Sequence, residues 1–303
     1  MSLFSLLAAL ALAYYRPLPR EDWLRRLFAP YAAALEGNFN DGQAQHGIIA
    51  ALLAVLLPTL IVAASYVALS NTHPLLGLAG GIGVLYVTLR FGRFGSVAEG
   101  IAQALRANNL EGARAELATW QACETGAYSD KEVARVGIEA TLRHAHHDLF
   151  APLFWFLLLG PAGALLYRLA YLLKNAWGGN NNDFCHFSQR LFDWLDWLPA
   201  RFTAGSFAVV GDFEDAVYCW RTQAASWPNQ AIGIILASGA GALGVRLGEG
   251  LHQNGGLQYR PELGLGDEAD ANYLSSAVGL IWRVLVLMGG LLLLLTFAHW
   301  LGN

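Results

Sequence analysis

The sequence has little charge for its size. Only 14% of its 303 residues are Asp, Glu, Lys or Arg, while 55% are hydrophobic and the mean hydropathy is +0.38. A soluble domain averages about a quarter charged residues, so this composition excludes an ordinary soluble protein. The formal net charge of −4 comes without any basic stripe, which excludes nucleic acid as a partner.

Cysteine is also scarce, and the N-terminus lacks the marks of a leader. Cys123, Cys185 and Cys219 are far apart and form no CxxC pair, so we expect inert packing, with one free thiol left by the odd number. No basic region precedes the apolar run from Ser2 to Tyr15, and no clear small-residue cleavage site follows it. We therefore expect no cleavable signal peptide.

Long apolar blocks account for the composition. Four of them read as membrane spans: Gly47 to Leu69, His73 to Leu89, Phe150 to Leu173 and Ala277 to Leu301. A bilayer core needs about 20 apolar residues in a helix. Two weaker blocks, Leu195 to Val210 and Ala231 to Val245, either span, re-enter or lie buried in the bundle. The sequence predicts an all-α polytopic membrane protein with about five transmembrane helices and a cytoplasmic helical segment.

The basic residues orient the chain in the membrane. Arginines gather between residues 16 and 26 and again between residues 90 and 143, on either side of two consecutive apolar blocks. Two crossings return the chain to one face, and the positive-inside rule makes that face cytoplasmic. We expect a multi-pass protein of the bacterial inner membrane, with the lipid bilayer as its first partner.

The polar segment 90–149 predicts helices of its own. Apolar residues recur at helical spacing from Val97 to Gln121, broken at Asn108 and Asn109, which indicates a helical hairpin. A capping box at Ser129 predicts a second helix running toward His147. We expect residues 1–303 to form a single membrane domain with 90–149 as a cytoplasmic helical insertion.

Several segments resemble one family of membrane proteins. They are ANNLEGARAELA, ARVGIEATLRHAHHDLFAPLFW, GALLYRLAYLLKNAWG, RLFDWLDWLPARFTA, GAGALGVRLGEG and the stretch Tyr259 to Gly266. In order and spacing, from about Val97 to the C-terminal helix, they resemble the CobD/CbiB family. The resemblance implies an adenosylcobinamide-phosphate synthase, which joins an aminopropanol-type linker to a corrin acid side chain in cobalamin biosynthesis. A shorter relative, the AmpE membrane protein associated with β-lactamase induction, shares the APLFW and DWLPAR-like pieces.

The chain departs from the synthase pattern at polar positions. Glu139, Ala151, Pro152, Tyr167 and Arg168 match the pattern. Acidic or Asn residues of the pattern are replaced by Arg143, His144, His147, Tyr171 and Lys174. Of two adjacent acids before Pro-Ala-Arg only Asp193 remains, and the Leu-Gly-Asp-Pro signature is missing.

These losses set the functional prediction. Packing motifs are kept, whereas groups that would bind phosphate or activate an acid are replaced. We therefore predict a non-catalytic, AmpE-like sensor or accessory protein, with an adenosylcobinamide-phosphate synthase as the alternative. Its partner is expected to be an anionic or corrinoid ligand, or another membrane protein.

The ligand-binding candidates are Glu139, Arg168, Asp193 and Arg201. Arg168 and Arg201 lie in or beside apolar blocks, so each needs a buried partner, a phosphate or an exit to the interface. Asp193 and Asp196 are the candidate partners for Arg201. We predict that a pocket, if one is kept, gathers these four candidates.

A polar cluster is predicted at His144, His147 and Asp148, which share one face of a helix. Their spacing is compatible with a metal, but a zinc site needs three or four ligands and no further ligand is evident nearby. We favour a polar cluster at the membrane surface, and predict neither a metal nor a cofactor.

Overall fold

The computed structural model describes residues 2–16, 23–90, 93–178, 183–253 and 256–301. Most of them are helical, and the segment between α11 and α12 contains a small antiparallel sheet of β1 (Leu251–Gln253) and β2 (Gly256–Gln258). The predicted all-α class is confirmed.

The chain forms two compact units, residues 1–91 with 147–199, and residues 92–146 with 200–303. Helix α9 (Asp183–Val210) contributes to both. The first unit also contains α1 (Ser2–Tyr15), α2 (Trp23–Phe39), α3 (Ala44–Thr72), α4 (Pro74–Thr88) and α8 (Ala151–Trp177). The second unit also contains α5 (Arg93–Arg106), α6 (Leu110–Gln121), α7 (Asp130–Ala145), α10 (Phe213–Gln223), a 3-10 turn (Ala224–Ser226), α11 (Gln230–Leu243) and α12 (Ala271–Leu301).

The first unit is built around α3, whose two sides differ. Ala50, Ala51, Ala54 and Val55 are fully buried in the core that α3 forms with α2 and α8. The other side of α3 exposes a row of large aliphatic side chains: Leu53, Leu56, Leu57, Leu60 and Ile61. So much exposed apolar surface on one helix suits contact with lipid and not with water.

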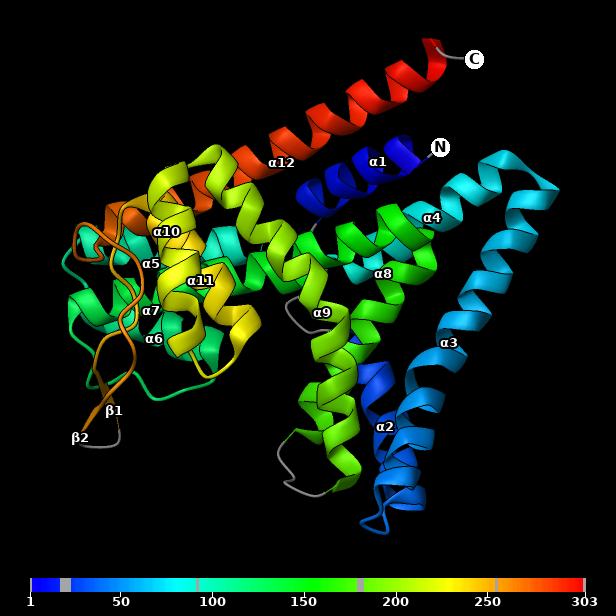
Figure 1. Cartoon of the computed structure of the whole chain (residues 1–303), viewed down its shortest axis with the longest axis horizontal. Helices are drawn as coiled ribbons and strands as arrows, with labels where there is room; N and C mark the ends of the chain where they lie inside the picture. Colours follow the sequence, from blue (N-terminus) through cyan, green and yellow to red (C-terminus); the bar gives the residue numbers. More distant parts are fainter. Residues whose placement is uncertain (1, 17–22, 91–92, 179–182, 254–255, 302–303) are drawn as a thin grey trace. The chain divides into compact units, whose positions relative to one another are not determined.

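Helices long enough to cross a membrane appear at three places in the described chain. These are Ala44–Thr72, Asp130–Trp177 and Ala271–Ala298, judged by length and composition. The predicted block 47–69 lies in the first of them, and the predicted block 277–301 overlaps the last of them as far as residue 298. The predicted blocks at 73–89 and 231–245 form shorter helices, α4 and α11, of 15 and 14 residues. Figure 1 shows α3 and α4 as the two arms of a hairpin, joined at His73.

Helix α8 is interrupted at Gly160. This residue has φ 68° and ψ −158°, a non-helical conformation, and Pro161 follows it. The side chains of His147 and Tyr167 are hydrogen-bonded at 2.8 Å. In a straight helix residues 20 apart would lie about 30 Å from each other. The chain therefore turns back on itself at Gly160, and the predicted block 150–173 is a helical hairpin.

The second unit contains the helices predicted for the polar segment. α5 and α6 pack together across a turn in which Asn108 has φ 56° and Asn109 caps α6 by accepting from Gly112 N at 3.0 Å. The predicted capping box is present, with Ser129 and Glu132 bonded reciprocally at the start of α7. A short π-helix (His146–Phe150) continues α7. The Gly- and Asn-rich stretch 178–183, whose composition predicts a break between helices, falls between α8 and α9, and its residues 179–182 lie outside the described ranges.

The small residues of α11 serve close helix packing. A Cβ added at Gly239 would lie 2.7 Å from Leu142 Cδ1, and one at Gly241 would lie 2.5 Å from Asp215 O. Both distances are shorter than van der Waals contact, so α11 approaches α7 and α10 as closely as glycine permits. These contacts indicate that the run of small residues serves helix packing.

We expect Gly241→Ala to lower the free energy of unfolding by about 1–3 kcal/mol, because the new methyl group meets the backbone of α10. Gly289→Ala in α12 is the matched control, since nothing lies within 4 Å of its Cβ position and alanine favours a helix. Thermal unfolding of the detergent-solubilised protein measures both. Equal melting temperatures for the two variants would contradict the packing argument.

We expect Cys219 to resist alkylation at pH 8. Burial in α10, with a smaller effect of the Asp215 charge, raises the pKa of its thiol to about 11, so the reactive thiolate is scarce below that pH. Cys123 is partly exposed and should react with iodoacetamide first. Mass spectrometry of the peptides at pH 8, before and after unfolding in detergent and urea, gives the comparison. Equal rates in the folded protein would refute this expectation.

Candidate functional site

Helix α7 presents three charged side chains on one face. Glu132, Arg135 and Glu139 are spaced by three and four residues, and each is more than nine-tenths buried. Buried charges are costly unless they are paired and hydrogen-bonded. Their partners come from the segment that follows α11, more than 100 residues later in the chain.

Glu139 is held by a two-armed contact. Arg260 Nη1 donates to Glu139 Oε2 at 2.7 Å, and Arg260 Nη2 donates to Oε1 at 3.1 Å. The backbone N–H of Gly248 also donates to Oε1, at 2.9 Å. The guanidinium lies over the Trp227 ring, 5.7 Å from its centroid. Such a fork fixes both the carboxylate and the loop that carries the arginine.

The other two charges of α7 are bound to the same segment. Arg135 pairs with the Glu249 carboxylate, and its Nη2 donates to Gly250 O at 2.7 Å. Its Nε is buried and has no hydrogen-bond partner among the described residues. Glu132 Oε1 accepts from the backbone N–H of His252 at 2.8 Å and lies 2.9 Å from His252 Nδ1.

The backbone of this segment is bent to reach α7. Gly248 and Glu249 both have positive φ, 76° and 57°. A Cβ on Gly248 would collide with Pro261 O, so glycine is required at this position. Reciprocal backbone hydrogen bonds between Leu247 and Leu263, at 2.7 and 2.9 Å, close the segment into a loop. The loop places Gly248, Glu249 and Arg260 against the polar face of α7. We call these contacts the α7 charge network.

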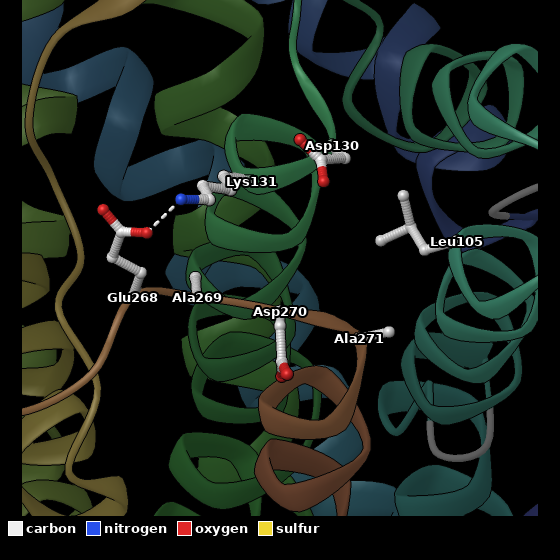
Figure 2. Close-up of a pocket in the computed structure, with 7 residues that line it drawn as sticks. All are labelled: Leu105, Asp130, Lys131, Glu268, Ala269, Asp270 and Ala271. Carbon is white, nitrogen blue, oxygen red and sulfur yellow. Dashed lines mark hydrogen bonds and ion pairs between the residues drawn. The ribbon is translucent and has the colours of Figure 1, made fainter. Parts of the chain in front are cut away.

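A cavity lies beside the N-terminus of α7. It has a volume of about 350 Å³ and is lined by Leu105, Asp130, Lys131, Glu268, Ala269, Asp270 and Ala271. Figure 2 shows the Lys131–Glu268 ion pair at one side of it. The Lys131 ammonium holds the pKa of Glu268 below its usual range. With one lysine and three acids, the lining favours a cationic group over an anionic one.

A second buried polar group lies in the first unit. Tyr167 Oη donates to Asp196 Oδ1 at 2.7 Å, and because the hydroxyl has one proton, it accepts from His147 Nδ1–H at 2.8 Å. Next to this chain of bonds, Arg168 Nη1 donates to Asp148 Oδ1 at 2.7 Å. All five side chains are buried. We call them the first-unit polar network.

The four predicted ligand-binding residues are divided between the two units. Glu139 belongs to the α7 charge network, and Arg168 pairs with Asp148. Asp193 pairs with Lys174 at 3.2 Å, and Arg201 lies half-buried on α9. Glu139 and Arg201 belong to the second unit, Arg168 and Asp193 to the first. Their grouping into one pocket stays a prediction, as does the pairing of Arg201 with an aspartate.

The predicted polar cluster has separate contacts for each member. The His144 ring stacks on Trp120 with 5.1 Å between centroids, His147 binds Tyr167, and Asp148 binds Arg168. The π-helix at His146–Phe150 changes the angular spacing of these residues from that of an α-helix. A shared role at the membrane surface stays a prediction.

Sequence reasoning did not select Glu132, Arg135, Glu249, His252 or Arg260 as site residues. The spacing of the three charges in the KEVARVGIEA stretch was visible and places them on one helical face. Their partners could not be read from it, because no local pattern connects α7 with a loop more than 100 residues away.

Known proteins match the chain over most of its length. The model of the CobD/Cbib protein family matches residues 6–281. The cobalamin biosynthesis protein CobD of Stutzerimonas stutzeri is 36% identical over 309 aligned positions, covering 99% of both chains. The protein of the same name from Chromobacterium violaceum is 37% identical, covering 77% of this chain and 75% of its own. No solved structure matches.

These matches correct the functional prediction. The prediction of a non-catalytic, AmpE-like sensor is wrong, because the family model and two relatives, one of them aligned over 99% of both chains, are named for cobalamin biosynthesis or for CobD. The replaced residues had been interpreted as lost chemistry. In the structure His147 is hydrogen-bonded to Tyr167 at 2.8 Å and Lys174 binds Asp193, so polar contacts persist at these two positions.

The family model covers nearly the whole chain, and one relative aligns with it over 99% of both chains. The chain belongs to the CobD/CbiB family.

Proposed function

We propose that this protein is an adenosylcobinamide-phosphate synthase acting in cobalamin biosynthesis. The observation that carries the proposal is the 36% identity to a cobalamin biosynthesis protein over 99% of both chains. The reaction forms a C–N bond between the carboxyl carbon of a corrin side chain and the amine of an aminopropanol-type linker, with formal loss of water.

The α7 charge network supports this proposal by its location and chemistry. It joins three of the segments that resemble the family: the Glu139 stretch of α7, the GALGVRLGEG stretch and the Tyr259–Gly266 stretch. Its charges alternate in sign, which suits a linker carrying both an ammonium and a phosphate group. The buried Nε of Arg135 is the donor that we propose for an anionic oxygen of a substrate.

Glu139 and Arg260 have a supporting role in this proposal. Both carboxylate oxygens of Glu139 already accept hydrogen bonds from Arg260 and Gly248. We propose that the pair orients the loop, and with it Glu249, against Arg135 of α7 and toward the substrates. Arg168, Asp193 and Arg201 remain proposed ligand contacts, for which their charge in or near apolar helices is the reason.

The proposal includes location in the bacterial inner membrane with several crossings. Apolar helices suited to lipid contact support it, together with the basic residues at 16–26 and 90–143. On this proposal residues 1–303 form the family's membrane domain, and 90–149 is its cytoplasmic helical insertion.

Complementation tests the activity. We expect the gene to restore cobalamin-dependent growth of a synthase-deficient bacterium supplied with cobyric acid and the linker precursor. The S. stutzeri relative serves as the positive control. No growth, with the protein shown by immunoblot to be in the membrane, would overturn the proposal.

The Glu139–Arg260 pair can be tested by a double-mutant cycle. We expect Glu139→Gln and Arg260→Lys each to lower the synthase rate at least about tenfold, since each loses the charged fork (about 1.4 kcal/mol per factor of ten). The double variant should be little worse than the more damaging single one, because the two act through one contact. Glu111→Gln, which breaks an exposed pair with Arg114, is the control and should keep normal activity. Additive losses in the double variant would contradict this role.

A further inference from the structure

The hairpin within α8 carries no charge over its central part. From Leu149 to Tyr167 no residue is Asp, Glu, Lys, Arg or His. The charged residues begin immediately on either side, at Asp148 and Arg168, and these two are bonded to each other. The apolar helical hairpin thus has an ion pair at its base, between Asp148 and Arg168.

Three contacts show that the hairpin is tightly folded. His147 and Tyr167 are bonded across its base at 2.8 Å. Near its tip, a Cβ on Gly163 would lie 2.7 Å from Leu159 Cβ and would collide with Trp155 O. Gly160, with φ 68°, lies between these residues. The two arms therefore run back along each other from base to tip.

The neighbours of the hairpin place it at membrane depth. α8 packs against α3 and α4. α3 is an apolar helix of 29 residues with a row of exposed leucines. At the tip of the hairpin Leu158 and Leu159 are 58% and 55% exposed. Exposed leucines beside a lipid-facing helix continue the surface that lipid covers.

The first arm is too short to cross a bilayer. From Ala151 to Leu159 it rises about 14 Å, at 1.5 Å per residue. The hydrocarbon core is about 30 Å thick. Beyond the base, the second arm continues away from the tip to Lys174 and Asn175, polar residues that suit the membrane surface or water.

We infer that residues 151–177 form a re-entrant hairpin: its tip at Leu158 and Leu159 contacts lipid hydrocarbon, and both of its ends lie on one face of the membrane. The chain thus does not cross the bilayer here. The first-unit polar network, bonded across the base, lies near that face, where its buried charges cost less than at the bilayer centre. This inference does not depend on the synthase activity.

Labelling of single cysteines from each side of the membrane tests the topology. In a variant whose three native cysteines are replaced by alanine, Asn175→Cys and Glu111→Cys are compared in sealed spheroplasts and in inverted vesicles, using a membrane-impermeant maleimide. Residue 111 precedes the hairpin and residue 175 follows it, and both are exposed. We expect both to react from the same face, whereas one crossing between them would put them on opposite faces.

Asn71→Cys is the matched control. It lies exposed in the last turn of α3 and should react from the other face, which also shows that the vesicles are sealed. Reaction of Asn175→Cys from the same face as Asn71→Cys would overturn the inference. Ala176→Cys, also exposed, replaces Asn175→Cys if that variant does not accumulate.

A spin label at Leu158→Cys tests the lipid contact in phosphatidylethanolamine–phosphatidylglycerol liposomes. We expect its relaxation to respond to oxygen, which partitions into lipid, and much less to a water-soluble nickel chelate. A stronger response to nickel would place the tip in water. No response to either reagent would mean that the tip packs against protein, such as a second copy of the chain. Either result would overturn the contact with lipid.

Discussion

The pairing of Glu139 with Arg260 is the contact on which the arrangement of the second unit depends. A buried carboxylate needs a partner of opposite charge and further hydrogen bonds, because burial removes its hydration. Among the described residues, the Arg260 guanidinium and the Gly248 N–H donate to Glu139, and both come from one loop. Meeting that requirement brings two segments together that are 121 residues apart in the chain.

Buried polar side chains of the first unit also have hydrogen-bonding partners, but these partners are much closer in the sequence. There the partners of His147 and Asp148 lie 20 residues further along, on the second arm of α8. They come within reach because Gly160 adopts a conformation that a residue with a side chain rarely takes. One glycine thus decides whether a long apolar stretch is a straight helix or a hairpin.

The replaced motif residues show why a list of matched positions is an incomplete guide to activity. His147, Tyr171 and Lys174 differ from the pattern that was expected of a synthase, yet each takes part in a polar or aromatic contact. A change of residue type does not by itself remove a position from the contacts of the fold. The relatives that match this chain are named for cobalamin biosynthesis.

The helical class, the hairpin at Asn108–Asn109 and the capping box at Ser129 were determined by the sequence alone. Each depends on residues a few positions apart, where helix periodicity and backbone preferences act. The partners of Glu132, Arg135 and Glu139, and the fold-back at Gly160, were decided only by the tertiary structure. The sequence shows that a buried charged side chain needs a partner. Which distant residue is that partner depends on how the whole chain packs.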